Sequence, residues 1–229
     1  MLTALDIFNN FEQEKYKQLD DPPWKLPTLS IDLEPTQHEQ AHPLAIRNRC
    51  LDYIEKYKYH VRIYTDGSKS DSGCGCAMFV ENDKTTRTIS LPKTSSALSA
   101  ELIAILQSLH WARDNNKNKL AIFSDSLSGL QAIKNGKLDN SIVNDILLIH
   151  KVLATNGYRI TFIWIPAHVG VPGNEHADRL AKRAATKYDE ALQLPLSSGE
   201  AKRQIYLFVQ KEWENEYAAS VNGSLYKTL

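Results

Sequence analysis

The spacing of apolar residues along the 229-residue chain predicts a sheet in its central part. Alternation begins at Val61 and Ile63, and two more apolar runs follow closely, joined by a polar turn at Asn82 and Asp83. Three strands in such close succession predict an antiparallel meander. Two further β-branched and aromatic runs occur later in the chain. The five predicted strands cover residues 61–65, 73–80, 85–91, 119–124 and 159–165.

Helical spacing of apolar residues separates and follows these runs. Over residues 98–112 apolar side chains recur every three or four positions, and Ser95 or Ser96 can cap that helix. Asn174 is a favoured N-cap residue for a last helix. The remaining helices are predicted over residues 126–135 and 140–155. The order β-β-β-α-β-α-α-β-α predicts an α/β fold, with a five-stranded mixed sheet and helices on its faces.

The two ends of the chain lack this pattern. We expect an N-terminal extension or linker (1–59), a central α/β domain (60–190) and a C-terminal helical tail (191–229). The extension is expected to contain a short helix near Leu5, a proline-stiffened connector over 21–27 and a helix over 43–57. The tail is expected to form a helix over 198–219. Its apolar stripe, which we expect to dock on another surface, consists of Ile205, Phe208, Val209 and Trp213.

Composition and charge narrow the class of protein without identifying it. The chain has 27 basic and 27 acidic residues, so it lacks the positive excess of many nucleic-acid-binding proteins. Carboxylates gathered for metal binding would offset basic residues in this sum. No apolar run suits a bilayer and no signal-peptide pattern is present, so we expect an intracellular protein, in cytoplasm or nucleus, without membrane contact. Cys50, Cys74 and Cys76 lack zinc-site spacing and are expected to be free thiols.

Four acidic residues fall where a single site would need them. Asp66 and Asp125 follow two predicted strands, and ligands of open α/β sheets gather at the carboxyl ends of strands. Glu101 lies in the first turns of one helix, and Asp178 lies near the start of the last. Taken singly, each acid has a structural explanation as a turn residue, a helix-terminus charge or a cap, and residues 66–68 are predicted to form a turn. Their joint placement favours one site.

Such a cluster of carboxylates requires cations, because like charges a few Å apart cannot all stay ionised. Oxygen ligands with open positions select Mg²⁺ or Mn²⁺ over zinc. Two such ions about 4 Å apart can activate water and stabilise the leaving oxygen at a phosphodiester. His168 precedes Asp178 by ten positions on a loop rich in glycine and proline, which favours a role in proton transfer or product release.

The ordered set of motifs at residues 65–68, 100–102, 124–126 and 168–178 resembles the ribonuclease H family. The resemblance covers about residues 59–188. Residues 164–168 (Trp-Ile-Pro-Ala-His) look most similar to the ribonuclease H domains of retrotransposons without long terminal repeats, where the domain follows a reverse transcriptase. The resemblance implies cleavage of the RNA strand of RNA–DNA hybrids, with 3′-hydroxyl and 5′-phosphate products. It also implies two Mg²⁺ ions as cofactors, replaceable by Mn²⁺.

Carried onto this sequence, the resemblance implies a role for each candidate residue. Asp66, Glu101, Asp125 and Asp178 would be catalytic metal ligands, and Asp66 would bridge both ions. His168 would assist proton handling or release of the cleaved phosphate. The implied substrate contacts are the main chain of Gly67 and Ser68 to the RNA backbone, Thr94 and Ser96 to a DNA phosphate, and Asn174 as a further contact.

Two departures from the family pattern affect substrate choice. Ala97 and Leu98 stand where cellular members usually carry the Asn-Gln pair that contacts RNA 2′-hydroxyls, so metal-dependent cleavage is implied more firmly than hybrid selectivity. Residues 135–139 are too short for a basic protrusion, and affinity is expected from a partner, such as a reverse transcriptase domain in a longer polyprotein. Alternatives are a DNA-processing or transposase-like enzyme of this fold, and a catalytically silent scaffold that holds nucleic acid. The presence of all four acids favours an active enzyme.

Overall fold

A six-stranded sheet forms the centre of the fold, in a computed structural model that describes residues 27–33, 42–136, 140–187 and 198–219. The strands are β1 (Ser30–Asp32), β2 (Val61–Ser70), β3 (Gly73–Val80), β4 (Thr86–Leu91), β5 (Lys119–Ser124) and β6 (Arg159–Trp164). The helices are α2 (Pro43–Glu55), α3 (Ala97–Asp114), α4 (Leu127–Lys134), α5 (Ser141–Thr155), α6 (Pro172–Ala185) and α7 (Ser198–Ala219). The described residues fall into two compact units, one from β1 to α6 and one containing α7.

The strand order is β1-β6-β5-β2-β3-β4. β2, β3 and β4 pair antiparallel, which confirms the predicted meander, whereas β2, β5 and β6 pair parallel. The mixed α/β fold is therefore confirmed, but the predicted count of five strands is wrong. The sixth strand, β1, pairs parallel with β6 and sets Ile31 opposite Phe162. A segment of three residues is too short to show a periodic pattern, so β1 is a strand only because it pairs with β6.

The predicted turn at residues 66–68 is wrong, because β2 continues through them to Ser70 and stays paired with β3. Gly67 lies inside the strand for a steric reason. A Cβ atom at this position would lie 2.5 Å from the backbone nitrogen of Glu101 in α3. The glycine thus lets the strand and the helix backbone approach closely, which is a common reason for glycine within a strand.

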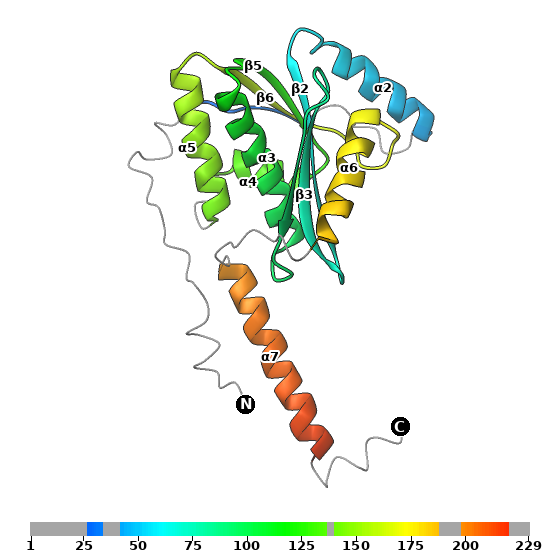
Figure 1. Cartoon of the computed structure of the whole chain (residues 1–229), viewed down its shortest axis with the longest axis vertical. Coiled ribbons are helices and arrows are strands. Elements are labelled where there is room, and N and C mark those ends of the chain that lie inside the picture. Colours follow the sequence, from blue (N-terminus) through cyan, green and yellow to red (C-terminus); the bar gives the residue numbers. More distant parts are fainter. Residues whose placement is uncertain (1–26, 34–41, 137–139, 188–197, 220–229) are drawn as a thin grey trace. The chain divides into compact units, whose positions relative to one another are not determined.

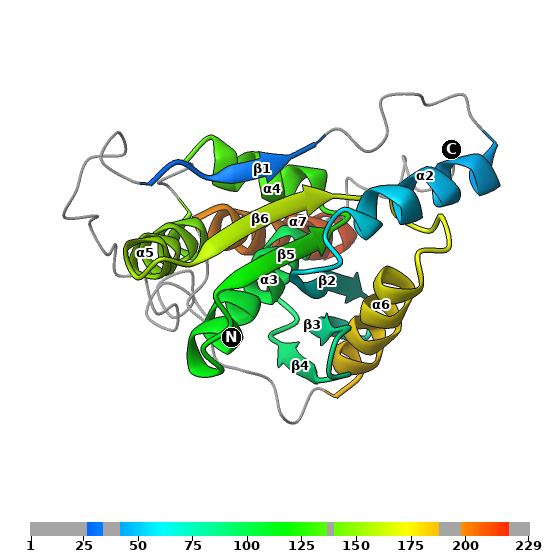
Figure 2. The same cartoon turned by 90° about the horizontal axis from the view of Figure 1, so that it is seen from above.

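Helices cover both faces of the sheet (Figures 1 and 2). α3, α4 and α5 lie on one face, over a core that includes Ile63, Ile122 and Phe162. α2 and α6 lie on the other face, where Tyr64 and Phe123 are buried. Successive residues of each strand point to opposite faces, so residues adjacent in the sequence pack into the hydrophobic cores on opposite faces of the sheet. This two-sided burial explains the nearly continuous apolar runs that predicted the strands.

The helix starts depend on local capping. Ser96 caps α3, and its Oγ accepts a hydrogen bond from Ser99 N at 3.0 Å, as predicted for Ser95 or Ser96. The prediction of Asn174 as the N-cap of α6 is wrong, since the helix begins at Pro172 and its N-cap is Val171. Proline suits the first helical position because it lacks the N–H that would have no partner there.

α7 is described by itself, as the second unit. Its bounds agree with the predicted helix over 198–219, and it carries the exposed side chains of Tyr206, Val209 and Trp213. Docking of its apolar stripe stays a prediction. The short helix expected near Leu5 and residues 21–26 of the expected connector lie outside the described residues. No helix in the described part of the chain combines the length and apolar character needed to span a bilayer.

Candidate active site

Asp66 of β2, Glu101 of α3 and Asp125, which directly follows β5, lie together beside the carboxyl end of β5. Each offers a carboxylate oxygen, and the three oxygens lie within 4.8 Å of one another. The parallel pairing of β2 with β5 sets Thr65 opposite Ser124, so the two aspartates that follow these residues come side by side. Glu101 joins them because the start of α3 packs directly against β2.

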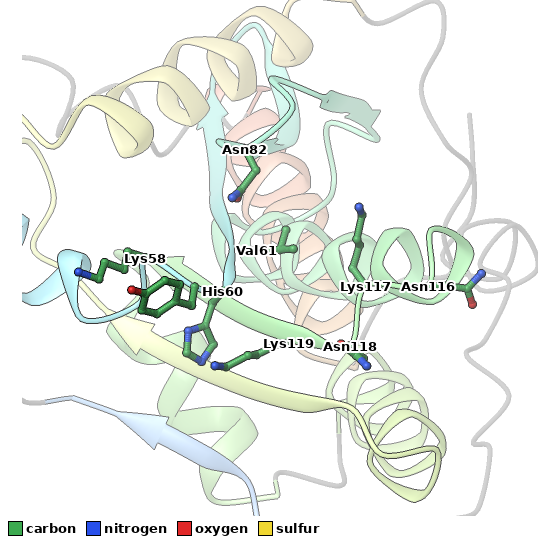
Figure 3. Close-up of a pocket in the computed structure, with 9 residues that line it drawn as sticks. Lys58, His60, Val61, Asn82, Asn116, Lys117, Asn118 and Lys119 are labelled. Atoms are coloured by element: carbon green, nitrogen blue, oxygen red, sulfur yellow. The ribbon is translucent and has the colours of Figure 1, made fainter.

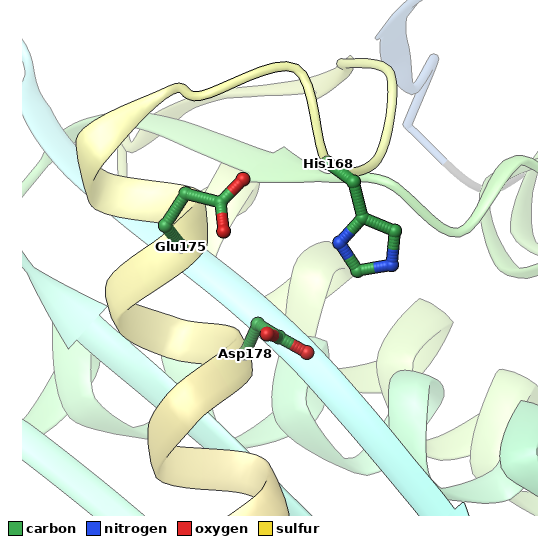
Figure 4. A group of neighbouring side chains, drawn as sticks. All are labelled: His168, Glu175 and Asp178. Carbon is green, nitrogen blue, oxygen red and sulfur yellow. The ribbon is translucent and has the colours of Figure 1, made fainter.

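A second group, formed by His168, Glu175 and Asp178, adjoins the first. Its ring nitrogen and carboxylate oxygens also lie within 4.8 Å of one another, and Figure 4 shows the three side chains directed toward a common space. His168 lies in the loop between β6 and α6, whereas the two acids lie on α6, three positions apart. The charge of Asp178 raises the pKa of both Asp66 and Asp125, so the two groups form one electrostatic unit.

Glu175 is a member of this unit that the sequence did not single out. It lies on the same face of α6 as Asp178, because residues three apart on a helix are neighbours. That spacing was the available signal. Glu175 Oε1 also accepts a hydrogen bond from the backbone N–H of Gly170, at 3.3 Å, which ties it to the His168 loop.

Burial raises the pKa values of these acids, and repulsion between their charges adds to the rise. Burial, together with the charges of Asp125 and Asp178, raises the pKa of Asp66 to about 8. Burial, reinforced by Asp66 and Asp125, raises the pKa of Glu101 well above its usual range. Burial also raises the pKa of Asp125, although a hydrogen bond from Asn174 opposes the rise. At neutral pH such a cluster keeps protons unless a cation replaces them.

The donor set fits a divalent cation. All the acids of the first group offer hard oxygen ligands, which Mg²⁺ and Mn²⁺ prefer. Glu101 Oε2 is buried and has no hydrogen-bond partner within the described part of the chain. A buried carboxylate oxygen without a partner is costly, and a cation is one group that would satisfy it.

Asn174 and Trp164 hold Asp125 in place. Asn174 Nδ2 donates to Asp125 Oδ2 at 2.9 Å, and Trp164 Nε1 donates to the backbone carbonyl of Asp125 at 3.1 Å. Asn174 is only 2% exposed, so its amide nitrogen faces the carboxylate from inside the protein. Its position explains why an asparagine follows the start of α6 although it does not cap the helix.

The predicted substrate contacts stay predictions. Gly67 and Ser68 follow Asp66 directly along β2. Thr94 is partly buried in the turn before α3, and Ser96 uses its Oγ to cap that helix. The positions of these residues do not by themselves indicate what they bind.

A separate cavity of about 310 Å³ lies at the other end of β2 and β5, where these strands begin (Figure 3). Its lining residues are Lys58, Tyr59, His60, Val61, Asn82, Asn116, Lys117, Asn118 and Lys119. None of them carries a carboxylate. The cavity therefore lacks anionic oxygen ligands for a divalent cation, and the carboxylate cluster is the better candidate for the chemical site.

Comparison with known proteins identifies the family. The profile of the family described as RNase H matches residues 58–186. The chain is 28% identical to human Ribonuclease H1 in an alignment of 191 positions that covers 71% of this chain and 66% of that protein. It is 28% identical to mouse Ribonuclease H1 in an alignment of 147 positions that covers 57% of this chain and 52% of that protein. A Ribonuclease H of Albidiferax ferrireducens is 49% identical over 35 residues, 15% of this chain and 24% of that protein.

The chain thus spans about half to two thirds of the length of the mammalian relatives. The family profile covers more than half of the chain and contains all four acids that the sequence singled out, together with His168. The chain belongs to the ribonuclease H family.

Proposed function

We propose that this chain is an endonuclease that cleaves the RNA strand of RNA–DNA hybrids and leaves 3′-hydroxyl and 5′-phosphate ends. The observation that carries the proposal is the meeting of Asp66, Glu101 and Asp125 at the carboxyl edge of the sheet, with Asp178 acting on them from α6. Membership of the ribonuclease H family supports the same reaction. The chain is then a hydrolase that depends on divalent metal ions.

The four acids would hold two Mg²⁺ ions, with Asp66 shared between them, and Mn²⁺ would substitute. Such ions, when bound, supply an activated water and stabilise the charge that develops on the leaving oxygen. The protein's own contribution is to hold the carboxylates in place before the ions arrive. Asn174 fixes Asp125 by its amide, and the strand pairing of β2 with β5 fixes the spacing of the two aspartates.

His168 is proposed to handle a proton during the reaction or to help release the cleaved phosphate. Its ring nitrogen lies within 4.8 Å of carboxylate oxygens of Glu175 and Asp178, so the imidazole faces the acidic unit. A neutral imidazole can accept a proton near neutral pH and pass it on. The main chain at Gly67 and Ser68 is proposed to lie along the RNA, and Thr94 and Ser96 to hold a DNA phosphate.

We also propose that the domain derives from a retroelement and works beside a reverse transcriptase domain. The support is the sequence of residues 164–168, which resembles retrotransposon ribonuclease H domains. All three cysteines are buried thiols outside any disulfide, which fits a reducing compartment such as the cytoplasm or nucleus.

The test is hydrolysis of a labelled RNA–DNA hybrid in Mg²⁺ and in Mn²⁺, with duplex DNA and duplex RNA of the same sequence alongside. Cleavage of the hybrid alone supports the proposal. Cleavage of duplex DNA would instead support the DNA-processing alternative, and no cleavage of any substrate would support the silent scaffold. Because Ala97 and Leu98 replace the usual Asn-Gln pair, the duplex RNA control is essential.

Substitutions of two aspartates, one in β2 and one in the turn after it, test the assigned role of Asp66 in this assay. Asp66→Asn should abolish cleavage, since it removes a charge from the centre of the cluster. Asp71→Asn is the matched control, because Asp71 is exposed in the turn after β2 and is not part of the cluster. Cleavage that survives Asp66→Asn would overturn the assigned role.

A further inference from the structure

Helix α2 packs against the loop that carries His168. Ile46 and Cys50 of α2 belong to the same hydrophobic cluster as Val169 and Val171, which flank that loop's glycine. Figures 1 and 2 show α2 beside the loop between β6 and α6. The family profile begins at residue 58, so α2 lies before the segment that defines the family. This helix therefore lies outside the segment that the family profile matches and contacts the loop that carries His168.

The peptide groups at Gly170 are held from two sides. Arg47 Nε donates a hydrogen bond to the carbonyl oxygen of Gly170 at 2.9 Å, across a separation of 123 residues in the sequence. The backbone N–H of Gly170 donates to Glu175 Oε1 at 3.3 Å. Arg47 from α2 and Glu175 from α6 thus fix one residue of the loop, two positions after His168.

The loop has a backbone conformation that needs such support. His168 has a φ of 56°, in the left-handed region that L-residues with a side chain seldom adopt. Gly170 has a φ of 83°, and a Cβ there would lie 3.1 Å from Arg47 Cδ. A non-glycine residue persists in this region only where its surroundings enforce it. The contacts from α2 and α6 hold this loop at Gly170, two positions after His168.

We propose that Arg47 is a positioning residue that holds the His168 loop so that the imidazole faces the acidic unit. The inference rests on the proposed function, since it assigns α2 a part in the same reaction. Arg47 acts on the loop through the carbonyl of Gly170, to which its Nε donates. The functional unit of this chain then begins at α2 rather than at residue 58.

The experiment compares the full chain with Arg47→Gln, with the conservative Arg47→Lys and with Arg49→Gln. Arg49 is exposed on the same helix and loses the same charge, so it is the matched control. Arg47→Gln should lower kcat for hybrid cleavage about tenfold, because misplacement of a catalytic group acts on the rate rather than on binding. KM and the Mg²⁺ dependence should stay the same, Arg47→Lys should restore part of the rate, and Arg49→Gln should have no effect.

A second measurement separates positioning from a loss of stability. Arg47→Gln combined with His168→Ala should be no slower than His168→Ala alone, because the loop then has no imidazole to position. Hydrogen exchange of the backbone amides of residues 167–171 should be faster in Arg47→Gln at a temperature where the variant remains folded. Additive effects in the double variant, or unchanged exchange, would overturn the inference. If the parent chain does not cleave the hybrid, the proposed function fails. If the parent cleaves it and Arg47→Gln has the same kcat as Arg49→Gln, only the role of Arg47 is overturned.

Discussion

Replacing Asp66 by asparagine should stabilise the protein in the absence of divalent cations while it abolishes cleavage. The pKa of Asp66 is raised from 3.8 to about 8, so between these values the folded protein holds a proton that the unfolded chain has lost. Stability must then fall as the pH rises from about 4 to about 8. The neutral amide of asparagine removes this dependence, and the stabilising effect of the variant should be largest near pH 8 and absent below pH 4.

The magnitude follows from the same pKa. A difference of about four pH units, at about 1.36 kcal/mol per unit, sets an upper limit of about 5–6 kcal/mol for the cost of ionising Asp66 in the folded state. Protonation of Glu101 or Asp125, whose pKa values are also raised, relieves part of the repulsion. We therefore expect a gain of about 1–3 kcal/mol at pH 8, or about 3–10 °C in Tm for a domain of this size.

The assay is thermal unfolding in EDTA from pH 4 to pH 8.5, followed by the same series with saturating Mg²⁺. In EDTA the stability of the parent should fall toward pH 8 and that of Asp66→Asn should fall less. Mg²⁺ should stabilise the parent, since it binds only the folded cluster, and should have little effect on the variant. Asp71→Asn should follow the parent throughout. A metal-free parent whose stability does not fall between pH 5 and pH 8, or an Asp66→Asn variant less stable at pH 8, would refute the reasoning.

Three further substitutions test the surroundings of the cluster. Asn174→Ala removes the donor to Asp125 Oδ2; it should cost about 1–3 kcal/mol and raise the pKa of Asp125, observed by carboxyl carbon NMR in EDTA. Lys182→Gln removes the exposed ammonium that lies 2.8 Å from Asp178 Oδ2; it should lower the Mg²⁺ concentration for half-maximal cleavage about twofold to threefold, and an increase would contradict the argument. Gly67→Ala places a Cβ against the backbone of α3; it should destabilise the fold by about 3 kcal/mol in urea unfolding, and a neutral effect would show that α3 can move.

The elements that the sequence predicted well have a strong local pattern. The bounds of β3 and β5 agree with the predicted ranges because each strand is a nearly continuous apolar run, and the helix at 198–219 agrees because its apolar spacing repeats over several turns. Ser96 could be identified as a cap because its hydroxyl acts within the same turn. Local physics decides such features, and a single sequence contains all the information they need.

The features that the sequence missed depend on partners far along the chain. β1 exists as a strand because β6 pairs with it, and its own three residues carry no periodic signal. Asp66 and Gly67 have the composition of a turn, but α3 and β3 hold them in a strand. Asn174 has the composition of a cap, but it bonds Asp125, 49 positions earlier. In each case a tertiary contact overrides a correct local preference.

Arg47 and Glu175 extend this reasoning to the site itself. The four acids could be proposed from sequence because each falls near a predicted strand end or helix start, although β2 in fact continues past Asp66. Arg47 is 123 positions from Gly170 and lies on a helix with nothing unusual in its sequence, so only the fold connects the two. The acids are proposed to supply the chemistry. Long-range contacts such as that between Arg47 and Gly170 then decide how precisely the His168 loop is held beside them. We therefore expect some of the residues that affect the cleavage rate, such as Arg47, to lie outside the segment 58–186 that the family profile matches.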